Sequence, residues 1–242
     1  MGRKPAEVHV VELTAPFSDQ DDRAMRTYYD QRASEYDDWY LLVGRYARRQ
    51  GDARWKADLR VLAERVRAFG SGRLLEIACG TGWWTRELAV HGRVTAVDFA
   101  PAMLNVARER LRSMSLGADF VRADAYRLPF RANSFDSAFA GCWMSHVPNA
   151  RLPELFDGIC RVLKKGTPMM VIDTGVPSSE PGRPAPGTEY YNPRILNDGS
   201  RHRVLKIDHT PESLCAALAS LGPIQQAWEV GGFVGAVVEC SH

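Results

Sequence analysis

The chain has 242 residues, of which 45% are hydrophobic and 25% are charged, and its formal net charge is +2. It is long enough for one α/β domain with a substantial core and an N-terminal extension, and its charge gives no indication of a nucleic-acid footprint. The five cysteines form no C-x-x-C pair, and no apolar run approaches the length of a membrane span or signal peptide. We therefore expect a cytoplasmic monomer or homodimer that has no metal site and binds neither nucleic acid nor membrane.

The N-terminal quarter of the chain predicts a tail followed by helices. Residues 1–18 are expected to form a flexible tail, and residues 19–70 a helical lid or extension. Within this extension, apolar and aromatic residues that include Tyr29 and Tyr36 recur at helical spacing, which predicts a helix followed by a lid-like turn. A second helix is predicted at residues 53–69, where the apolar residues follow the same spacing.

A strand that ends in a glycine turn comes next. The apolar run at 74–78 is typical of a strand buried on both faces, and Gly80 and Gly82 allow the backbone to turn sharply and to approach a ligand closely. A helix is predicted at 83–90, and its N-terminus would point at whatever binds in the turn. This unit indicates a cofactor site of the nucleotide type.

The dinucleotide fingerprint G-x-G-x-x-G fits this turn poorly. Its third glycine position is Thr85, and the indoles of Trp83 and Trp84 would crowd a pyrophosphate. Glu76, inside the end of the strand, would repel a pyrophosphate but suits a ligand with a cationic amino group. The turn therefore favours a cofactor that carries an amino acid. The two indoles are interpreted either as helix packing or as pocket wall.

The rest of the chain alternates strands with helices and ends in a hairpin. Strands are predicted at 94–97, 119–122, 137–141 and 168–172, and helices at 101–114 and 152–164. Asp98 and Asp124 follow the first two of these strands. An insertion at about 176–209, which contains a hairpin turn at 197–199, precedes a helix at 211–221 and two antiparallel strands at 224–230 and 233–240.

From Tyr28 to the C-terminus, the order of these features resembles the class I S-adenosylmethionine-dependent methyltransferases, in particular their ubiquinone-biosynthesis-like, small-molecule branch. The resemblance is carried by the turn from Glu76 to Gly82, Val97-Asp98, Ala123-Asp124-Ala125, Leu128-Pro129-Phe130 with Ser134-Phe135-Asp136, Arg161-Val162-Leu163-Lys164-Lys165-Gly166, and the Tyr-Tyr-Asp and Glu-Tyr-Asp triplets of residues 28–37. It implies a doubly wound, mostly parallel α/β sheet of seven strands, Rossmann-like over residues 71–242, whose last strand is antiparallel.

The same resemblance implies S-adenosyl-L-methionine as the cofactor. Asp98 would accept hydrogen bonds from the ribose hydroxyls, and Asp124 would accept one from the adenine amino group. Met103 would lie against the adenine or be plain core. The expected cofactor-binding residues are Tyr29, Glu76, Gly80, Gly82, Asp98, Met103, Asp124, Ala125 and Gly141.

The segment at 141–148 faces the methyl group in this fold and carries the acceptor candidates. It has no Asn/Asp-Pro-Pro-aromatic motif and no acids, which argues against DNA amino methylation and a catechol-type metal site. His146 is the candidate general base, with a structural histidine as the alternative. Candidate substrate contacts are Tyr28, Tyr36, Trp143, Tyr190 and Tyr191, and weaker candidates are His202 and His209.

These residues predict methyl transfer to an O, N or C nucleophile of a small, aromatic or apolar metabolite, in secondary metabolism. The alternatives are an NAD(P)-dependent oxidoreductase and a non-catalytic protein that binds S-adenosylmethionine. The first would leave Asp124 and the terminal hairpin unexplained.

Overall fold

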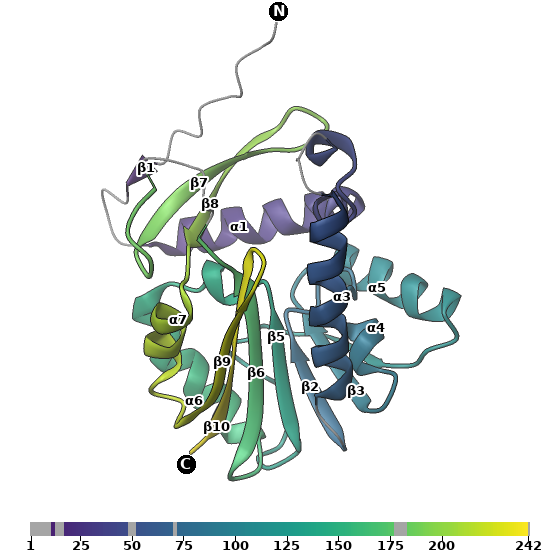
Figure 1. Cartoon of the computed structure of the whole chain (residues 1–242), viewed down its shortest axis with the longest axis vertical. Helices are drawn as coiled ribbons and strands as arrows, with labels where there is room; N and C mark the ends of the chain where they lie inside the picture. The colour runs from purple at the N-terminus through teal and green to yellow at the C-terminus, as the bar shows by residue number, and fades with distance from the viewer. Residues whose placement is uncertain (1–10, 13–16, 48–51, 70–71, 177–182, 242) are drawn as a thin grey trace, which may run out of the picture.

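The main sheet has seven strands in the order β4-β3-β2-β5-β6-β10-β9 (Figure 1). It comes from a computed structural model that describes residues 11–12, 17–47, 52–69, 72–176 and 183–241. Five neighbouring strands are parallel, and β10 is antiparallel to both β6 and β9, which confirms the predicted fold class. The strands are β2 (Arg73–Ile77), β3 (Arg93–Asp98), β4 (Asp119–Arg122), β5 (Ser137–Gly141), β6 (Thr167–Thr174), β9 (Ile224–Val230) and β10 (Phe233–Cys240).

Helices cover both faces of this sheet because successive strand residues point to opposite sides. Leu75 and Ile77 of β2 belong to one buried cluster, with residues of α6 (Leu152–Val162) and α7 (Pro211–Leu218). Leu74 belongs to a second cluster, with residues of α3 (Asp52–Ala68), α4 (Thr85–Leu88) and α5 (Pro101–Ser113). The core is therefore continuous on each side of the sheet.

The helix expected at 83–90 is much shorter in the structure, where α4 comprises only Thr85–Leu88. Residues 80–84 form a turn, and Gly82 has a φ of +74°, which a right-handed helix does not accommodate. Trp83 is stacked on Tyr40 with ring centroids 4.3 Å apart and an interplanar angle of 6°. Trp84 is also buried. Of the two interpretations of these indoles, packing is the correct one.

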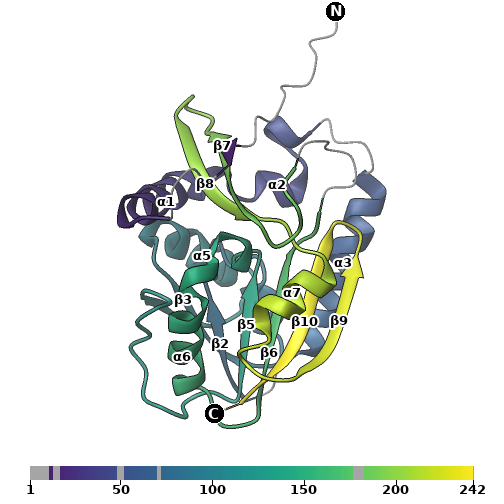
Figure 2. The same ribbon diagram turned by 90° about the vertical axis from the view of Figure 1, so that its left-hand side faces the viewer.

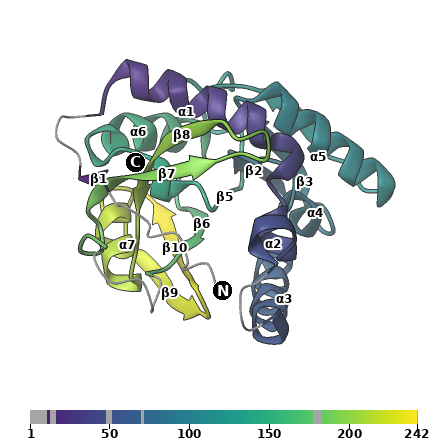
Figure 3. The same cartoon turned by 90° about the horizontal axis from the view of Figure 1, so that it is seen from above.

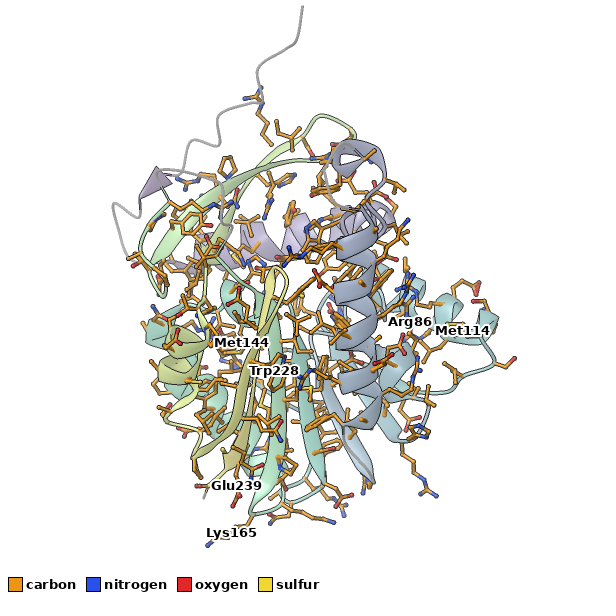
Figure 4. All side chains as sticks on the ribbon, viewed as in Figure 1. Arg86, Met114, Met144, Lys165, Trp228 and Glu239 are labelled. Carbon is orange, nitrogen blue, oxygen red and sulfur yellow. The ribbon has the colours of Figure 1, made fainter. Side chains whose placement is uncertain are left out.

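The first part of the N-terminal extension, residues 19–41, lies across the carboxyl ends of the parallel strands (Figures 1 and 3). It contains α1 (Asp19–Arg32), a 3-10 turn (Ala33–Glu35) and α2 (Asp38–Leu41). Ser18 and Asp21 form a capping box that begins α1, with the Ser18 hydroxyl accepting from the Asp21 N–H at 3.3 Å. Lys165 and Glu239 lie at the opposite end of the sheet (Figure 4). The extension thus covers the end of the sheet where α/β proteins bind ligands.

A second, three-stranded sheet rises above α1 (Figure 2). It consists of β1 (Val11–Glu12), β7 (Glu189–Ile195) and β8 (Arg201–Ile207), all antiparallel. The predicted hairpin turn is confirmed: Gly199 has a φ of +86°, and the Leu196 N–H donates to the Ser200 carbonyl at 3.0 Å. Of the predicted tail at 1–18, residues 1–10 and 13–16 lie outside the described residues. Among the helices that the structure describes, none combines the length and the apolar character needed to cross a bilayer.

Candidate cofactor and acceptor site

A cavity lies between α1 and the carboxyl ends of β2, β3, β4 and β5. It is lined by residues from these strand ends, from the start of α5 and from the extension. The cavity brings together many of the residues proposed from the sequence, namely Tyr29, Tyr36, Gly80, Asp98, Met103, Asp124, Ala125, Trp143 and His146. The cavity therefore has the features of a small-molecule site, in which a few polar groups are placed among apolar walls.

Asp98 connects β3 to the glycine turn. Its Oδ2 accepts the backbone N–H of Gly80 at 2.8 Å, and its Oδ1 accepts that of Ala100 at 2.9 Å. Burial raises the pKa of this carboxyl above its ordinary value. Since each carboxylate oxygen has two lone pairs, both oxygens retain capacity to accept a further hydrogen bond. The acid is suited to hold a pair of neighbouring hydroxyl groups.

The two glycines of the turn have different surroundings. Gly80 lines the cavity, with a φ of +53°. Gly82 does not line it: a Cβ on Gly82 would stand 3.0 Å from the Cβ of Ala107 and 3.1 Å from its Cα. The glycine is therefore required for close packing of the turn against α5, and the expectation that Gly82 contacts the cofactor is not supported by its position.

Glu76 and Gly141 also lie outside the cavity lining. Glu76 is 1% exposed, its Oε2 has no hydrogen-bond partner, and burial raises its pKa to about 8. A Cβ on Gly141 would stand 2.5 Å from Cδ1 of Trp84, so this glycine makes room for the indole. Because β2 alternates its side chains, Glu76 points to the face covered by α3–α5 and not toward the strand ends.

Asp124 is bound to the N-terminal helix, a contact that sequence reasoning missed. Its Oδ1 accepts the Tyr126 N–H at 3.0 Å, and its Oδ2 accepts from Nη2 of Arg26 at 2.9 Å. The same guanidinium donates through Nε to Asp22 at 2.6 Å and lies 4.0 Å above the Phe99 ring. The i, i+4 spacing of Asp22 and Arg26 was visible in the sequence, but it does not reveal a partner 98 residues away.

Two further contacts join the extension to the rim of the cavity. Asp30 accepts the N–H of Ala102, at the start of α5, at 3.0 Å. Asp37 accepts the Thr81 hydroxyl at 2.6 Å and forms an ion pair with Arg110. The glycine turn and α5 are thereby both tied to the segment that covers the cavity.

His146 is a neutral histidine with an assignable tautomer. Its Nδ1 lies 2.6 Å from the carbonyl oxygen of Leu205 in β8, and because a carbonyl only accepts, Nδ1 carries the proton and Nε2 keeps its lone pair. Burial and the charge of Lys206 lower the pKa of His146 to about 3. The ring lines the cavity edge-on to Tyr29, with centroids 5.6 Å apart. Such a group accepts a hydrogen bond well but is a weak general base at neutral pH.

The remaining substrate candidates fall into two groups. Tyr36 and Trp143 line the cavity. The other three do not: Tyr28 packs on His202 with centroids 5.2 Å apart, Tyr190 donates its hydroxyl to Asp208 at 2.7 Å, and Tyr191 lies beneath the guanidinium of Arg203 at 4.5 Å. The sequence placed these tyrosines in the insertion and the extension but did not indicate which way each one faces.

Comparisons with known proteins agree with the geometry of this site. Residues 74–166 match a family model described as a methyltransferase domain. The demethylmenaquinone methyltransferase of Listeria welshimeri is 34% identical over 110 residues, which cover 43% of this chain and 46% of that protein. That of Staphylococcus aureus is 36% identical over 112 residues, 44% of each chain. The match therefore spans less than half the length of these curated relatives.

Solved structures match over almost the whole chain. A DhpI–SAH complex is 27% identical with a TM-score of 0.72, covering 93% of this chain and 99% of that one. A DhpI–SAM–HEP complex is 26% identical with a TM-score of 0.73, covering 91% and 98%. The 1,6-didemethyltoxoflavin-N1-methyltransferase of Burkholderia thailandensis shares the fold, with a TM-score of 0.69 at 16% identity over 100% of this chain and 99% of that one. These matches favour S-adenosylmethionine over the dinucleotide alternative.

Proposed function

We propose that the chain is a class I S-adenosylmethionine-dependent methyltransferase, which its matches to a methyltransferase domain and to solved S-adenosylmethionine and S-adenosylhomocysteine complexes support, and that it transfers the cofactor's methyl group to an O, N or C nucleophile of a small metabolite. The observation that carries this proposal is the pair of hydrogen bonds from Gly80 and Ala100 to Asp98. They place one acid, the glycine turn and the start of α5 at a single point in a cavity that also contains Asp124.

The donor and acceptor groups of the cavity fit this cofactor. Asp98 would accept from the ribose hydroxyls, Asp124 from the adenine amino group, and Met103 and Ala125 would contact the adenine. The turn at Gly80 would hold the amino-acid part. When bound, the cofactor supplies an electrophilic methyl group on a sulfonium centre. The hydrogen bond from Arg26 to Asp124 uses one oxygen, and lone pairs on that carboxylate remain for a ligand.

On the acceptor side, Tyr29, Tyr36, Trp143 and His146 would surround the nucleophile. Nε2 of His146, with its lone pair, would accept a hydrogen bond from a hydroxyl or amine of the acceptor and so orient it for in-line displacement. Residues 19–70 would act as the lid that excludes water, and the insertion at 176–209 as the cap. The cavity aromatics support an acceptor with an aromatic or apolar part.

Transfer of labelled methyl from S-adenosylmethionine to a broad metabolite panel tests the proposal. We expect a labelled product with the wild type and none with Asp98→Ala. His146→Ala should retain cofactor binding and lose turnover. If cofactor binds and no compound accepts the label, the alternative of a non-catalytic binding protein is favoured instead.

A further inference from the structure

Charge is unevenly distributed around the cavity. The acids that line it are Asp22, Asp98 and Asp124, all on the side formed by α1, β3 and the loop after β4. Arg26 forms ion pairs with two of them, at 2.6 Å to Asp22 and 2.9 Å to Asp124. The proposed adenosine side of the cavity is therefore acidic, and one arginine offsets only part of its negative charge.

Basic side chains stand behind the other side, where the acceptor would bind. The guanidinium carbon of Arg32 lies 4.7 Å from the ring centroid of Tyr36, which lines the cavity, and 5.7 Å from that of Tyr28. This geometry places the arginine directly against the tyrosine wall. Arg32 belongs to the last turn of α1 and is partly buried.

Arg194 approaches the same wall from the hairpin. In the β7–β8 pair it is directly opposite His202, so the two side chains share one face of the hairpin. The ring of His202 is packed against Tyr28, which shows that this face is turned toward α1. In agreement, the charge of Arg194 acts to lower the pKa values of Tyr29 and His146, although burial dominates the shift of each.

Neither arginine has a carboxylate partner in the part of the chain that the structure describes. Among the residues that the structure describes, no acidic oxygen lies within 4.0 Å of the guanidinium of Arg32 or of Arg194. Lys206, a further cation near His146, does have acidic partners, because its Nζ is 3.7 Å from Asp173 and 4.0 Å from Asp208. A partly buried cation without an acidic partner is stabilised by an anion that binds beside it, because the tyrosine rings next to Arg32 compensate only part of the cost of desolvating its charge.

We propose that the acceptor substrate carries an oxyanion, either a carboxylate or a phosphorus oxyanion, which binds at the side of the cavity formed by Tyr29, Tyr36 and His146 and is attracted by Arg32 and Arg194. The inference rests on the proposed function. It makes the expected metabolite more specific: an aromatic or apolar part against the tyrosines, and an anionic group near the two arginines. A cleft with charge of one sign also raises the local concentration of a ligand of opposite sign.

The cofactor's own amino-acid carboxylate is a second source of the same chemistry. The position of Arg194 favours an oxyanion on the acceptor. Arg194 belongs to the cap hairpin, and its charge acts on the pKa of His146. The glycine turn, which would hold the amino-acid part of the cofactor, is instead bound to Asp37 and Asp98. The experiment must therefore measure cofactor and anion binding separately.

The test is calorimetric titration in two steps, first with S-adenosylhomocysteine and then, on the saturated protein, with benzoate, phenylphosphonate and the neutral benzamide. We expect at least one anion to bind at least tenfold more tightly than benzamide. Arg32→Gln and Arg194→Gln should each weaken that anion at least tenfold with unchanged affinity for S-adenosylhomocysteine, and Arg194→Lys should restore part of it. The matched control is Arg203→Gln, on the same hairpin, where a 61% exposed guanidinium lies 3.8 Å from Asp21.

The outcomes separate the two proposals. If the wild type does not bind S-adenosylhomocysteine, the proposed function fails. If it does, but neither anion binds better than benzamide, or Arg203→Gln weakens the anion as much as the other variants, the oxyanion site is refuted. The oxyanion site is also refuted if Arg32→Gln and Arg194→Gln lose affinity for S-adenosylhomocysteine while anion binding is unaffected. That result would assign both arginines to the carboxylate of the cofactor.

Discussion

Arg26 and Asp124 form an ion pair, 2.9 Å between Nη2 and Oδ2, that joins the N-terminal helix to the acid after β4. The two side chains are 22% and 30% exposed, so the pair is shielded from solvent without being fully buried. The helix that covers the cavity is thus attached to a residue proposed to bind the cofactor, and its stability depends on a contact between segments remote in the sequence.

Arg26→Ala should loosen α1 selectively. Removing a partly exposed pair costs on the order of 1 kcal/mol, which corresponds to about fivefold faster local opening. Hydrogen exchange measured by mass spectrometry should show faster exchange in α1 and unchanged exchange in β2 and β3. Arg112→Ala is the control, because its pair with Glu109 is on the exposed face of α5. Unchanged protection of α1 in Arg26→Ala would show that the pair does not anchor the helix.

Glu76 should make the protein without cofactor less stable as the pH rises. Burial raises its folded pKa to about 8 from an ordinary value of 4.5, so the native state binds more protons than the unfolded state between these values. The free energy of unfolding then falls by up to about 1.4 kcal/mol per pH unit in this window. Urea denaturation should show that Glu76→Gln removes this slope, whereas Glu109→Gln, an exposed acid, retains it. Parallel slopes for wild type and Glu76→Gln would contradict the assignment.

Ala78 has a left-handed backbone at the start of the turn, with a φ of +53°. A left-handed alanine is strained by about 1–2 kcal/mol, and replacement by glycine relieves this at a smaller entropic cost in the unfolded state. Ala78→Gly should therefore stabilise the protein by about 0.5–1 kcal/mol in thermal or urea unfolding. Ala138→Gly, at a buried site in β5 without positive φ, should destabilise it. Destabilisation by both substitutions would exclude strain at Ala78.

His146 should remain neutral across the physiological pH range. Its pKa, lowered to about 3 by burial and by Lys206, lies below the ordinary value, so the stability contributed by the neutral ring is lost only as the pH falls below about 6.5 toward 3. Nitrogen-15 NMR of the imidazole, assigned with His146→Gln, should show the proton on Nδ1 from pH 8 down to pH 5. A titration midpoint near 6.5 would refute the neutral tautomer and restore His146 as a candidate general base.

The positions of the main acids were predictable, because carboxyl ends of parallel strands meet at one edge and the sequence marks each end. Asp98 is the last residue of β3, Asp124 follows β4, and both line the cavity. Local patterning also identified the hairpin at Gly199. These features depend on residues close together in the chain, where strand ends and turns have characteristic residue types.

Other features depend on tertiary contacts that leave no local signal. Gly82 resembled a ligand-binding glycine until its neighbour Ala107 was known, and Glu76 resembled a site acid until the direction of its side chain was known. The low pKa of His146 comes from its burial and from the charge of Lys206, which the hairpin brings to it. Similarly, the partner of Arg26 is set by the path of α1 across the sheet.

Isothermal titration calorimetry tests the central claim most directly. The wild type and Asp98→Ala are each titrated with S-adenosylhomocysteine and, separately, with NAD, the cofactor of the alternative class. The control variant is Asp119→Ala, an exposed acid at the amino end of β4. We predict saturable binding of S-adenosylhomocysteine to the wild type and to Asp119→Ala, loss of it in Asp98→Ala, and no binding of NAD. Tight binding of NAD without binding of S-adenosylhomocysteine would contradict the account.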